Sequence, residues 1–520
     1  MARRRGSHRS CQGLTVRFAN PVLPGSHPDP SACRVGDDYY LATSTFEYFP
    51  GITLYHSRDL VHWRPIGAAL DRPSQLPLNG VRCSGGLYAP TLRHHEGTFY
   101  LVCTLVDGTA QSGNFLVTAD DPAGSWSEPV WLFDALGFDP SLLFDADGRC
   151  WMCGTHEDGG EGRTVVWVQE LDLAAGRLVG ERHSIWRGFA ADARWAEGPH
   201  LYRIRDSFYL IAAEGGTSFE HAVVAARSDS VTGPYEPCAR NPLLTHRHLG
   251  DAVPVVGVGH ADLLDLPDGS WWAVLLGMRP YSDGTWNLGR ETYLVPVGWQ
   301  DGWPLFNPGH GRVFLDERAP GLTPHPWPAP PTRDDFDGPE LGPQWLMIRT
   351  PREPWWSLTD RASHLRLQSR PEPLFSRGNP SFVGRRQQHR DFDARASIEA
   401  VPGVTAGLGV LTSDAFQLRL EVTDATVRLV ERKAGVEHAI ASQPVEPGPV
   451  HLGVAARGQE YAFAVNDDWL GTTDGRLLSW HEAGGFFGAV LGVFAVGVEP
   501  GYADVDWFDC IPRDGEQPSG

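Results

Sequence analysis

The chain has 520 residues, of which 41% are hydrophobic, so it is long enough for two domains with a sizeable core. Its formal net charge of −20 argues against nucleic acid, anionic membranes and polyanionic substrates as partners, and favours a neutral substrate. The 59 Gly and 42 Pro punctuate many turns, and the 19 Trp supply flat apolar surfaces that suit sugar rings. This composition is typical of an all-β protein.

Residues 1–16 begin with a basic segment but have no apolar segment behind it. They therefore predict a disordered tail and no recognisable secretion signal. No apolar run approaches the length that spans a bilayer. We accordingly expect a cytoplasmic protein without a membrane partner.

A short phrase recurs five times in the first 275 residues, at intervals of 50 to 63 residues. Each copy has a polar opening, an apolar run, a turn with Gly or Asp, and an aromatic-rich strand. The copies begin at Asp29, Ala89, Asp139, Glu197 and His260. Repeats at about this period predict a radial array of small sheets, a five-bladed β-propeller over residues 17–318. Since strands that open blades direct their first residues at the central funnel, three carboxylates and an imidazole are expected to converge in one pocket.

The eight cysteines are scattered along the chain and do not form the frame of a disulfide scaffold. Cys150 and Cys153 form a C-x-x-C pair, but they lie in a predicted strand, where residues three apart point to opposite faces. We therefore expect buried free thiols rather than a redox or zinc site.

The repeats give way to a proline-rich segment, residues 319–333, which predicts a stiff connector between domains. Beyond it, residues 334–513 show period-two alternation, as in 416–422 and 461–465, and predict an antiparallel β-sandwich. Residues 514–520 are expected to form a disordered tail. The sandwich is interpreted either as a binding module or as a structural partner that packs against the propeller and contributes one loop to the rim of its pocket.

Seven stretches of the propeller resemble, in the same order, the motifs of glycoside hydrolase family 43 in its β-xylosidase branch. They are residues 27–31, 44–51, 137–142, 195–201, 213–217, 259–262 and 288–292. Residues 334–513 resemble the accessory domain that usually follows, a concanavalin- or laminin-G-like jelly roll. One such motif is weakly specific, whereas the ordered set is strongly specific. The resemblance implies an inverting, exo-acting glycosidase that hydrolyses terminal β-D-xylosyl residues of xylo-oligosaccharides.

Cleaving a glycosidic bond requires two carboxyl groups on opposite sides of the anomeric carbon. The resemblance implies that Asp29 is the general base and Glu197 the general acid. It also implies that Asp139 is a third acid, which raises the pKa of Glu197 and orients it. A single Asp before Pro is more often a turn residue, but the complete set of motifs favours the catalytic interpretation. Inversion implies room for a water, with the two carboxyl groups roughly 6.5–9.5 Å apart.

The same resemblance implies that Arg290, His260, Phe46, Tyr88 and Thr217 bind the substrate. Arg290 is expected to hydrogen-bond sugar hydroxyls, and its alternative is a salt bridge to the adjacent acid or to another one. Phe46 is expected to form an apolar wall. Tyr88 stands where many relatives carry Trp, which leaves the sugar preference open. His260 is expected beneath the substrate, with a merely hydrogen-bonded buried histidine as the alternative.

No cofactor is expected to be required. In some relatives the histidine that matches His260 helps to hold a structural calcium ion through a water-rich shell, so His260 is a candidate ligand. No Asp-rich loop supplies the six to eight oxygens that calcium normally takes. Glu214 and Asp262 are expected to bond the backbone or neighbouring side chains, and Glu157 to lie in a solvated, Gly-rich loop.

Several functional alternatives stay open. The first is an α-L-arabinofuranosidase, or an enzyme with both activities, because the two sugars present similar hydroxyls. The second is a non-catalytic sugar-binding propeller, which would be expected to lack one of the carboxylates. The third, a retaining fructan-cleaving propeller, would need Cys-Pro after the acid, where this chain has Gly198-Pro199. The expected partners are neutral xylo-oligosaccharides or arabinosylated xylan fragments, and a homo-oligomer is left open.

Overall fold

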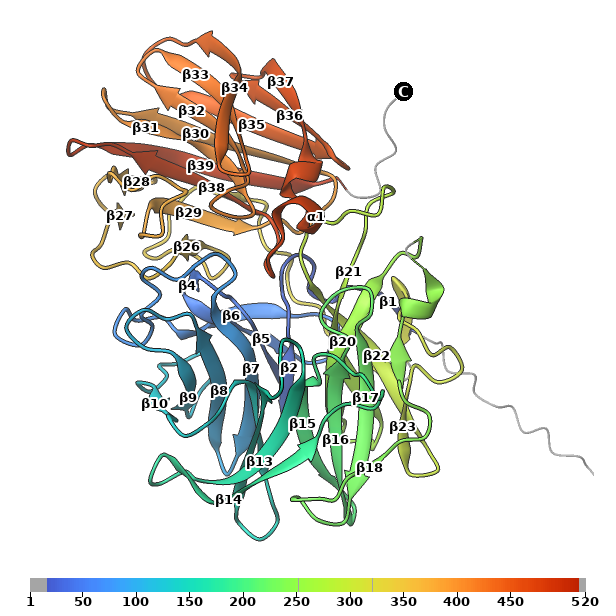
Figure 1. Cartoon of the computed structure of the whole chain (residues 1–520). Helices are drawn as coiled ribbons and strands as arrows, with labels where there is room; N and C mark the ends of the chain where they lie inside the picture. The colour runs from blue at the N-terminus through green and yellow to red at the C-terminus, as the bar shows by residue number, and fades with distance from the viewer. Residues whose placement is uncertain (1–15, 251, 320, 514–520) are drawn as a thin grey trace, which may run out of the picture.

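Five antiparallel sheets, each built from one consecutive stretch of chain, form the blades of a β-propeller in the N-terminal part of the molecule (Figure 1). The computed structural model describes residues 16–513 except residues 251 and 320. The disordered tails predicted over 1–16 and 514–520 lie outside the described residues, apart from Val16, which begins the first strand. The all-β prediction of a five-bladed propeller followed by a sandwich is confirmed.

The blades follow one another in chain order, and each runs from an inner strand to an outer strand. Blade I comprises β2 (Ser31–Val35), β3 (Asp38–Thr43), β5 (Gly51–Ser57) and β6 (Arg64–Leu70). Blade II comprises β7 (Gly86–His95), β8 (Thr98–Val106), β9 (Gly113–Ala119) and β10 (Val130–Trp131). Blade III comprises β11 (Phe138–Phe144), β12 (Cys150–Glu157), β13 (Thr164–Asp172) and β14 (Arg177–Trp186).

Blade IV comprises β15 (Glu197–Ile204), β16 (Ser207–Glu214), β17 (Ala222–Ser228) and β18 (Glu236–Pro237), and β19 (Leu244–Thr245) also pairs with β17. Blade V comprises β20 (Val256–Asp265), β21 (Trp271–Met278), β22 (Glu291–Gln300) and β23 (Trp303–Phe306). Strands inside the blades are buried along nearly their whole length, as in β5 and β20. Because each blade is covered on both faces by its neighbours, these strands need apolar residues in succession, which explains the aromatic-rich repeats.

A short two-stranded sheet joins the beginning of the propeller to its end. β1 (Val16–Ala19) pairs with β24 (Asp316–Ala319) in antiparallel register. The Asn20 side chain extends this junction, since its amide donates to the Leu294 carbonyl at 2.9 Å and accepts from the Leu294 N–H at 3.0 Å. The first described residues are thereby fixed to blade V.

The C-terminal sandwich has two sheets. The first contains β27 (Trp356–Ser357), β28 (Leu365–Gln368), β39 (Tyr502–Pro512), β30 (Phe392–Ala400), β35 (Val450–Arg457), β36 (Glu460–Val465) and β37 (Asp468–Asp474), with β25 (Arg333–Asp334) paired to β39. The second contains β34 (Val436–Pro444), β33 (Thr426–Lys433), β32 (Gln417–Thr423), β31 (Thr405–Leu411), β38 (Val490–Val496), β29 (Ser381–Arg386) and β26 (Leu346–Ile348). Burial alternates with period two along β35 and β36, because one face of each strand packs into the core.

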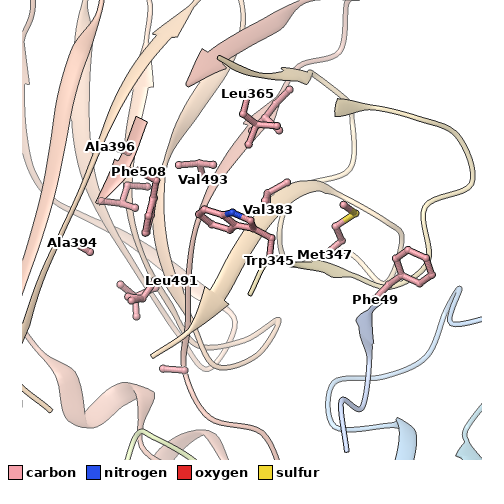
Figure 2. Packing of buried hydrophobic residues seen from close by; sticks show 14 of the residues in the cluster. Phe49, Trp345, Met347, Leu365, Val383, Ala394, Ala396, Leu491, Val493 and Phe508 are labelled. Carbon is pink, nitrogen blue, oxygen red and sulfur yellow. The ribbon is translucent and has the colours of Figure 1, made fainter. Parts of the chain in front are cut away.

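The two domains share a strand pair. β4 (Tyr48–Phe49), which lies between β3 and β5 in the chain, adds to the sandwich sheet by pairing with β26, so that Phe49 faces Met347 in register. One cluster of buried apolar residues extends from blade I through Phe49 into the sandwich. Figure 2 shows Phe49 on the propeller side next to Met347, with Trp345 beyond it in the sandwich. The sandwich is therefore docked on the propeller by backbone and core contacts together.

Regular helix is almost absent from the described residues. They contain the single-turn α1 (Trp480–Ala483) and the 3-10 turns η1 (Arg247–Leu249) and η2 (Gly475–Leu478). None of these could cross a bilayer. Cys150 and Cys153 are buried in β12 as free thiols, as expected, and burial raises the pKa of each to about 12. This high pKa disfavours thiolate chemistry there.

Candidate active site

The inner strand of each blade opens with the same backbone irregularity. A residue with φ between 41° and 57° stands at this place in every blade: Asp29, Ala89, Asp139, Gly198 and His260. In blades II to V the strand register shifts at this point. A bulge of this kind bends the strand and redirects its first side chain. The repeated phrase of the sequence therefore corresponds to a repeated bend around the central channel.

In the fourth copy of the repeated phrase, the residue at the bend stands one position later than the comparison of the five copies predicted. The structural equivalent of Asp29 and Asp139 is Gly198, whereas Glu197 precedes the bend and pairs with Ala213 of β16. A Cβ atom on residue 198 would lie 3.0 Å from the His260 ring, so the glycine leaves room for that imidazole. The predicted equivalence of Glu197 to the other opening residues is thus wrong by one position, but its carboxyl still lines the same pocket.

A cavity of about 590 Å³ opens at this end of the channel. Every blade contributes to its lining, and all eight of the predicted site residues are among the lining residues. They are Asp29 and Phe46 of blade I, Tyr88 of blade II, Asp139 of blade III, Glu197 and Thr217 of blade IV, and His260 and Arg290 of blade V. The structure thus brings together residues as far apart in sequence as 29 and 290.

Asp29 is a buried carboxylate held from three sides. Its Oδ2 accepts from Ser44 Oγ at 2.6 Å, and its Oδ1 accepts from Arg290 Nη1 at 2.9 Å. His260 Nδ1 lies 3.7 Å from the same Oδ1. Ser44 is itself fixed, because its Oγ accepts from the Ala89 N–H at 2.7 Å. These contacts fix the orientation of Asp29 at the bottom of the pocket.

Glu197 and Asp139 lie in an environment that favours the protonated acid. Burial raises the pKa of Glu197 well above its ordinary value of 4.5, and the neighbouring carboxyls of Asp139 and Asp29 raise it further. Burial also raises the pKa of Asp139 to about 6, while His260 opposes this rise. Asp139 Oδ2 accepts from the Gly198 N–H at 3.0 Å, which fixes the backbone directly after Glu197. Asp139 therefore acts on Glu197 through both charge and position.

Arg290 lies between the acids and the aromatic wall of the pocket. Its Nη1 contacts Asp29 and also donates to Thr217 Oγ1 at 3.2 Å. The guanidinium carbon is 5.5 Å from the centroid of the Phe46 ring. The alternative of a salt bridge to Glu291 does not hold, because Glu291 pairs with Arg279 at 2.7 Å, but the alternative of an ion pair with another acid does. Arg290 instead forms its ion pair with Asp29 inside the pocket.

The sandwich contributes one wall of the pocket through a residue, Phe486, that the sequence did not single out. Phe486, in the loop between α1 and β38, lines the pocket and stacks on Phe46 with ring centroids 6.0 Å apart. Its ring meets Tyr88 edge-on at 5.9 Å, and its carbonyl accepts from Arg290 Nε at 3.3 Å. Of the two interpretations of the sandwich, the structure agrees with a partner that lends a loop to the pocket.

The pocket has further lining residues that the sequence did not indicate as part of the site. They are Arg82, Val106, Phe138, Glu157, Trp195 and Gly216. Trp195 lies inside a motif, two residues before the acid, and an aromatic ring so close in sequence to that carboxyl is a signal that could have identified it. Phe486 gave no such signal, since its place in the pocket depends on contacts with residues nearly 200 positions away.

Asp262 ties the blades together beneath the site, as expected of a structural acid. It accepts from Ser31 Oγ at 2.7 Å, from Arg93 Nη1 at 2.8 Å and from Tyr202 at 2.5 Å. Burial opposes its charge, yet Arg93 and the hydrogen bonds hold the pKa of Asp262 well below its ordinary value. Glu214 likewise accepts from the Phe189 N–H at 2.9 Å. Glu157 is exposed, as expected, but lies at the rim of the pocket.

The surroundings of His260 do not match a calcium site built by the protein. Calcium normally takes six to eight oxygen ligands. Among the described residues, no group of three or more His, Cys, Asp and Glu side chains could hold a metal ion. His260 faces the Asp29 carboxylate and the Gly198 backbone. We therefore assign no catalytic step to calcium.

Two family models match the chain in consecutive segments. The model described as glycosyl hydrolases family 43 matches residues 18–304. The model described as the beta xylosidase C-terminal concanavalin A-like domain matches residues 333–510. The two matches correspond to the propeller and the sandwich.

Characterised relatives and solved structures match over almost the whole chain. A non-reducing end alpha-L-arabinofuranosidase from Bacteroides ovatus is 42% identical, covering 95% of this chain and 94% of the relative. A xylosidase/arabinosidase from Butyrivibrio fibrisolvens is 41% identical, covering 94% and 98%. The solved structure of a xylan beta-1,4-xylosidase from Bacillus halodurans superposes with a TM-score of 0.89 at 36% identity, covering 95% of this chain and all of that one.

Proposed function

Since this chain belongs to glycosyl hydrolases family 43 and is a glycosidase acting on O-glycosyl bonds, we propose that it removes single terminal β-D-xylosyl residues from xylo-oligosaccharides with inversion. The observation that carries the proposal is the pocket of about 590 Å³ in which Asp29, Asp139 and Glu197 meet Arg290. A neutral oligosaccharide also suits a chain with a net charge of −20.

Glu197 is the general acid of the proposed reaction. Its pKa is raised by burial and by two neighbouring carboxyls, which favours the protonated form that a general acid needs. It donates that proton to the glycosidic oxygen as the bond to the anomeric carbon breaks. Asp139 maintains this state through its charge and fixes the backbone at Gly198.

Asp29 is the general base. Its hydrogen bonds from Ser44 and Arg290 fix the carboxylate in one orientation. In an inverting reaction this carboxylate accepts a proton from a water molecule, and the oxygen of that water attacks the anomeric carbon from the face opposite the leaving group. Over one turnover Glu197 loses one proton to the leaving group and Asp29 gains one proton from the water, so the number of protons on the enzyme is unchanged.

The aromatic walls favour a single terminal sugar. Phe46, Tyr88 and Phe486 pack against one another on one side of the pocket. Flat apolar rings suit the faces of a sugar, and the Arg290 guanidinium beside them suits its hydroxyls. Lining from all five blades and from the sandwich supports an exo mode of action, in which the chain end enters the pocket.

A second candidate, α-L-arabinofuranosidase activity, alone or together with xylosidase activity, is favoured by the relatives. The Bacteroides ovatus relative is named as an arabinofuranosidase, and the Butyrivibrio relative carries both names. Both pentoses present similar hydroxyls to a pocket of this kind, so the same residues would serve either.

The deciding experiment measures rates on nitrophenyl β-D-xyloside and nitrophenyl α-L-arabinofuranoside, with the product anomer followed by NMR. The proposal expects hydrolysis of the xyloside with release of the inverted anomer. Release of the retained anomer would contradict the water-activating role of Asp29. A rate on the arabinofuranoside that exceeds the rate on the xyloside would favour the second candidate.

A further inference from the structure

The backbone N–H and the backbone carbonyl of Phe486 both anchor its loop to the propeller. The Phe486 N–H donates to Ser84 Oγ at 2.8 Å, and the Phe486 carbonyl accepts from Arg290 Nε at 3.3 Å. Because the Phe486 ring is one wall of the pocket, these two contacts fix that wall to the propeller at the residue that forms it, while the Gly488 N–H, which donates to Ser26 Oγ at 3.1 Å, fixes the loop two residues later. The Arg290 contact belongs to the site already described, whereas Ser84 lies outside the pocket lining.

Ser84 occupies an unusual place for a serine. It lies between β6 and β7, is only 5% exposed, and has φ of 58°, in the left-handed region. A glycine adopts this conformation at lower cost, so a serine here is strained. What serine adds is its hydroxyl, and that hydroxyl accepts from Phe486. A Cβ atom on Gly485 would come within 2.6 Å of the same oxygen, so the sandwich loop is shaped for this close approach.

Glu47 holds Ser84 from the opposite side. Its Oε2 accepts from the Ser84 N–H at 3.0 Å, and its side chain is only 2% exposed. Glu47 directly follows Phe46, the ring on which Phe486 stacks. The Glu47 carbonyl also accepts from the Arg349 N–H of the sandwich at 2.8 Å. Burial raises the pKa of Glu47 to about 7, so a carboxylate at this position is energetically unfavourable.

These contacts form one continuous chain of hydrogen bonds. It runs from the docked sandwich through Glu47 and Ser84 to Phe486, and the Ser84 carbonyl also accepts from the Tyr88 hydroxyl. We propose that Ser84, held by Glu47, is a positioning residue that fixes Phe486 against Phe46 and thereby sets the affinity of the pocket for the terminal sugar. The effect on the sugar rests on the proposed function, whereas the anchoring of the loop does not.

The first test measures anchoring without reference to activity. Ser84→Gly removes the hydroxyl and relieves the strained conformation, so the variant is expected to fold. In hydrogen exchange followed by mass spectrometry, the segment 484–489 should exchange about tenfold faster in this variant, because one hydrogen bond to its backbone is lost. Ser363→Gly is the matched control, since Ser363 is exposed and has φ of 56°.

The second test measures the consequence for the pocket. On whichever nitrophenyl pentoside the wild type hydrolyses, Ser84→Gly should raise KM about tenfold and change kcat less than about threefold. This pattern is expected because the wall binds the sugar equally in the ground state and the transition state. Glu47→Ala should act like Ser84→Gly, whereas Glu47→Gln, which keeps an acceptor oxygen, should restore KM to within about threefold of the wild type.

The outcomes separate this inference from the proposed function. Unchanged exchange of segment 484–489 in Ser84→Gly, or an equal change in Ser363→Gly, would overturn the anchoring role. Faster exchange with an unchanged KM would overturn the link to sugar affinity. A wild type that hydrolyses neither pentoside would contradict the proposed function, and the exchange rates would then decide the role of Ser84 by themselves.

Discussion

At the scale of single residues, three acids of similar chemistry have different environments. Asp29 receives hydrogen bonds from Ser44 and Arg290, which suit a charged base. Glu197 has two acids nearby and burial that favours the proton. Asp139 interacts through its charge with both of these acids and accepts from the Gly198 N–H. The proposed division of work between base and acid thus follows from the partners of each carboxyl.

Removing the proposed general acid, Glu197, should have an effect that depends on the leaving group. Glu197→Ala is expected to lower kcat on xylo-oligosaccharides by about 10²- to 10⁴-fold, because the leaving oxygen no longer receives a proton. On a substrate with an acidic leaving group, such as dinitrophenol, the loss should be much smaller. Steady-state kinetics on both substrates check this. Glu181→Ala, at an exposed acid of β14, is the control, and an equal loss on both substrates would contradict the acid role.

Neutralising Asp139 should shift the pH dependence in a defined direction. The alkaline limb of the activity profile reports loss of the proton from the general acid. Since Asp139 raises the pKa of Glu197, Asp139→Asn should lower that pKa and move the alkaline limb to lower pH. Profiles of kcat against pH check this, with Asp147→Asn, an exposed acid of the same blade, as control. An alkaline limb at its original pH would refute this role of Asp139.

At the scale of elements, β4 is unusual because it belongs to the propeller by sequence and to the sandwich by pairing. Two residues suffice for this, since Tyr48 and Phe49 pair with Ile348 and Met347. The pair brings Phe49 into the apolar cluster that both domains share. Because Phe46 and Glu47 immediately precede β4, the same junction that docks the sandwich also positions one wall of the pocket.

Truncation of Phe49 should reveal how much this junction contributes to stability. Phe49 is 5% exposed, and Phe49→Ala is expected to lower the free energy of unfolding by about 3–5 kcal/mol, through lost burial and the cavity that remains. Urea denaturation measures the change. Phe133→Ala, at a side chain that is 78% exposed, should stay within about 0.5 kcal/mol of the wild type. Equal stability of the two variants would mean that Phe49 at the junction contributes nothing to the free energy of unfolding.

At the scale of the whole molecule, three buried acids in and beside the site make the free energy of unfolding depend on pH. Glu47, Asp139 and Glu197 all have raised pKa values in the folded protein, mainly because of burial. The folded state therefore binds more protons than the unfolded state between the ordinary and the raised pKa values. The stability that these groups contribute is complete below the ordinary pKa and is lost as the pH rises through the raised one.

Glu47 allows this linkage to be measured. Its pKa rises from 4.5 to about 7, so the wild type should lose stability relative to Glu47→Gln between these pH values. At pH 8 the variant should be more stable by on the order of 1–3 kcal/mol. Thermal or urea denaturation of both proteins from pH 4 to 8 gives the difference. Acids with lowered pKa values, such as Asp262, change the stability of both proteins equally, so their contribution cancels in the difference. A constant difference across this range would contradict the assigned burial effect.

The sequence alone determined the all-β architecture and the five-fold repeat, and it named the three acids and five further residues that the structure brings together in one pocket. These were readable because a blade is built from consecutive residues, so its turns, apolar strands and opening residue recur with a regular spacing. Arg290 and Thr217 were found through their motifs rather than through spacing.

Only the tertiary structure decided the one-residue offset of Glu197, the wall formed by Phe486 and the anchoring of that wall by Ser84 and Glu47. The offset depends on a local bulge, which the residue pattern around Gly198 does not distinguish from a regular strand start. Phe486 reaches the pocket because β4 joins a sheet that begins some 300 residues later in the chain. Contacts between segments so far apart leave no periodic signal, since their partners are chosen by packing of the whole molecule.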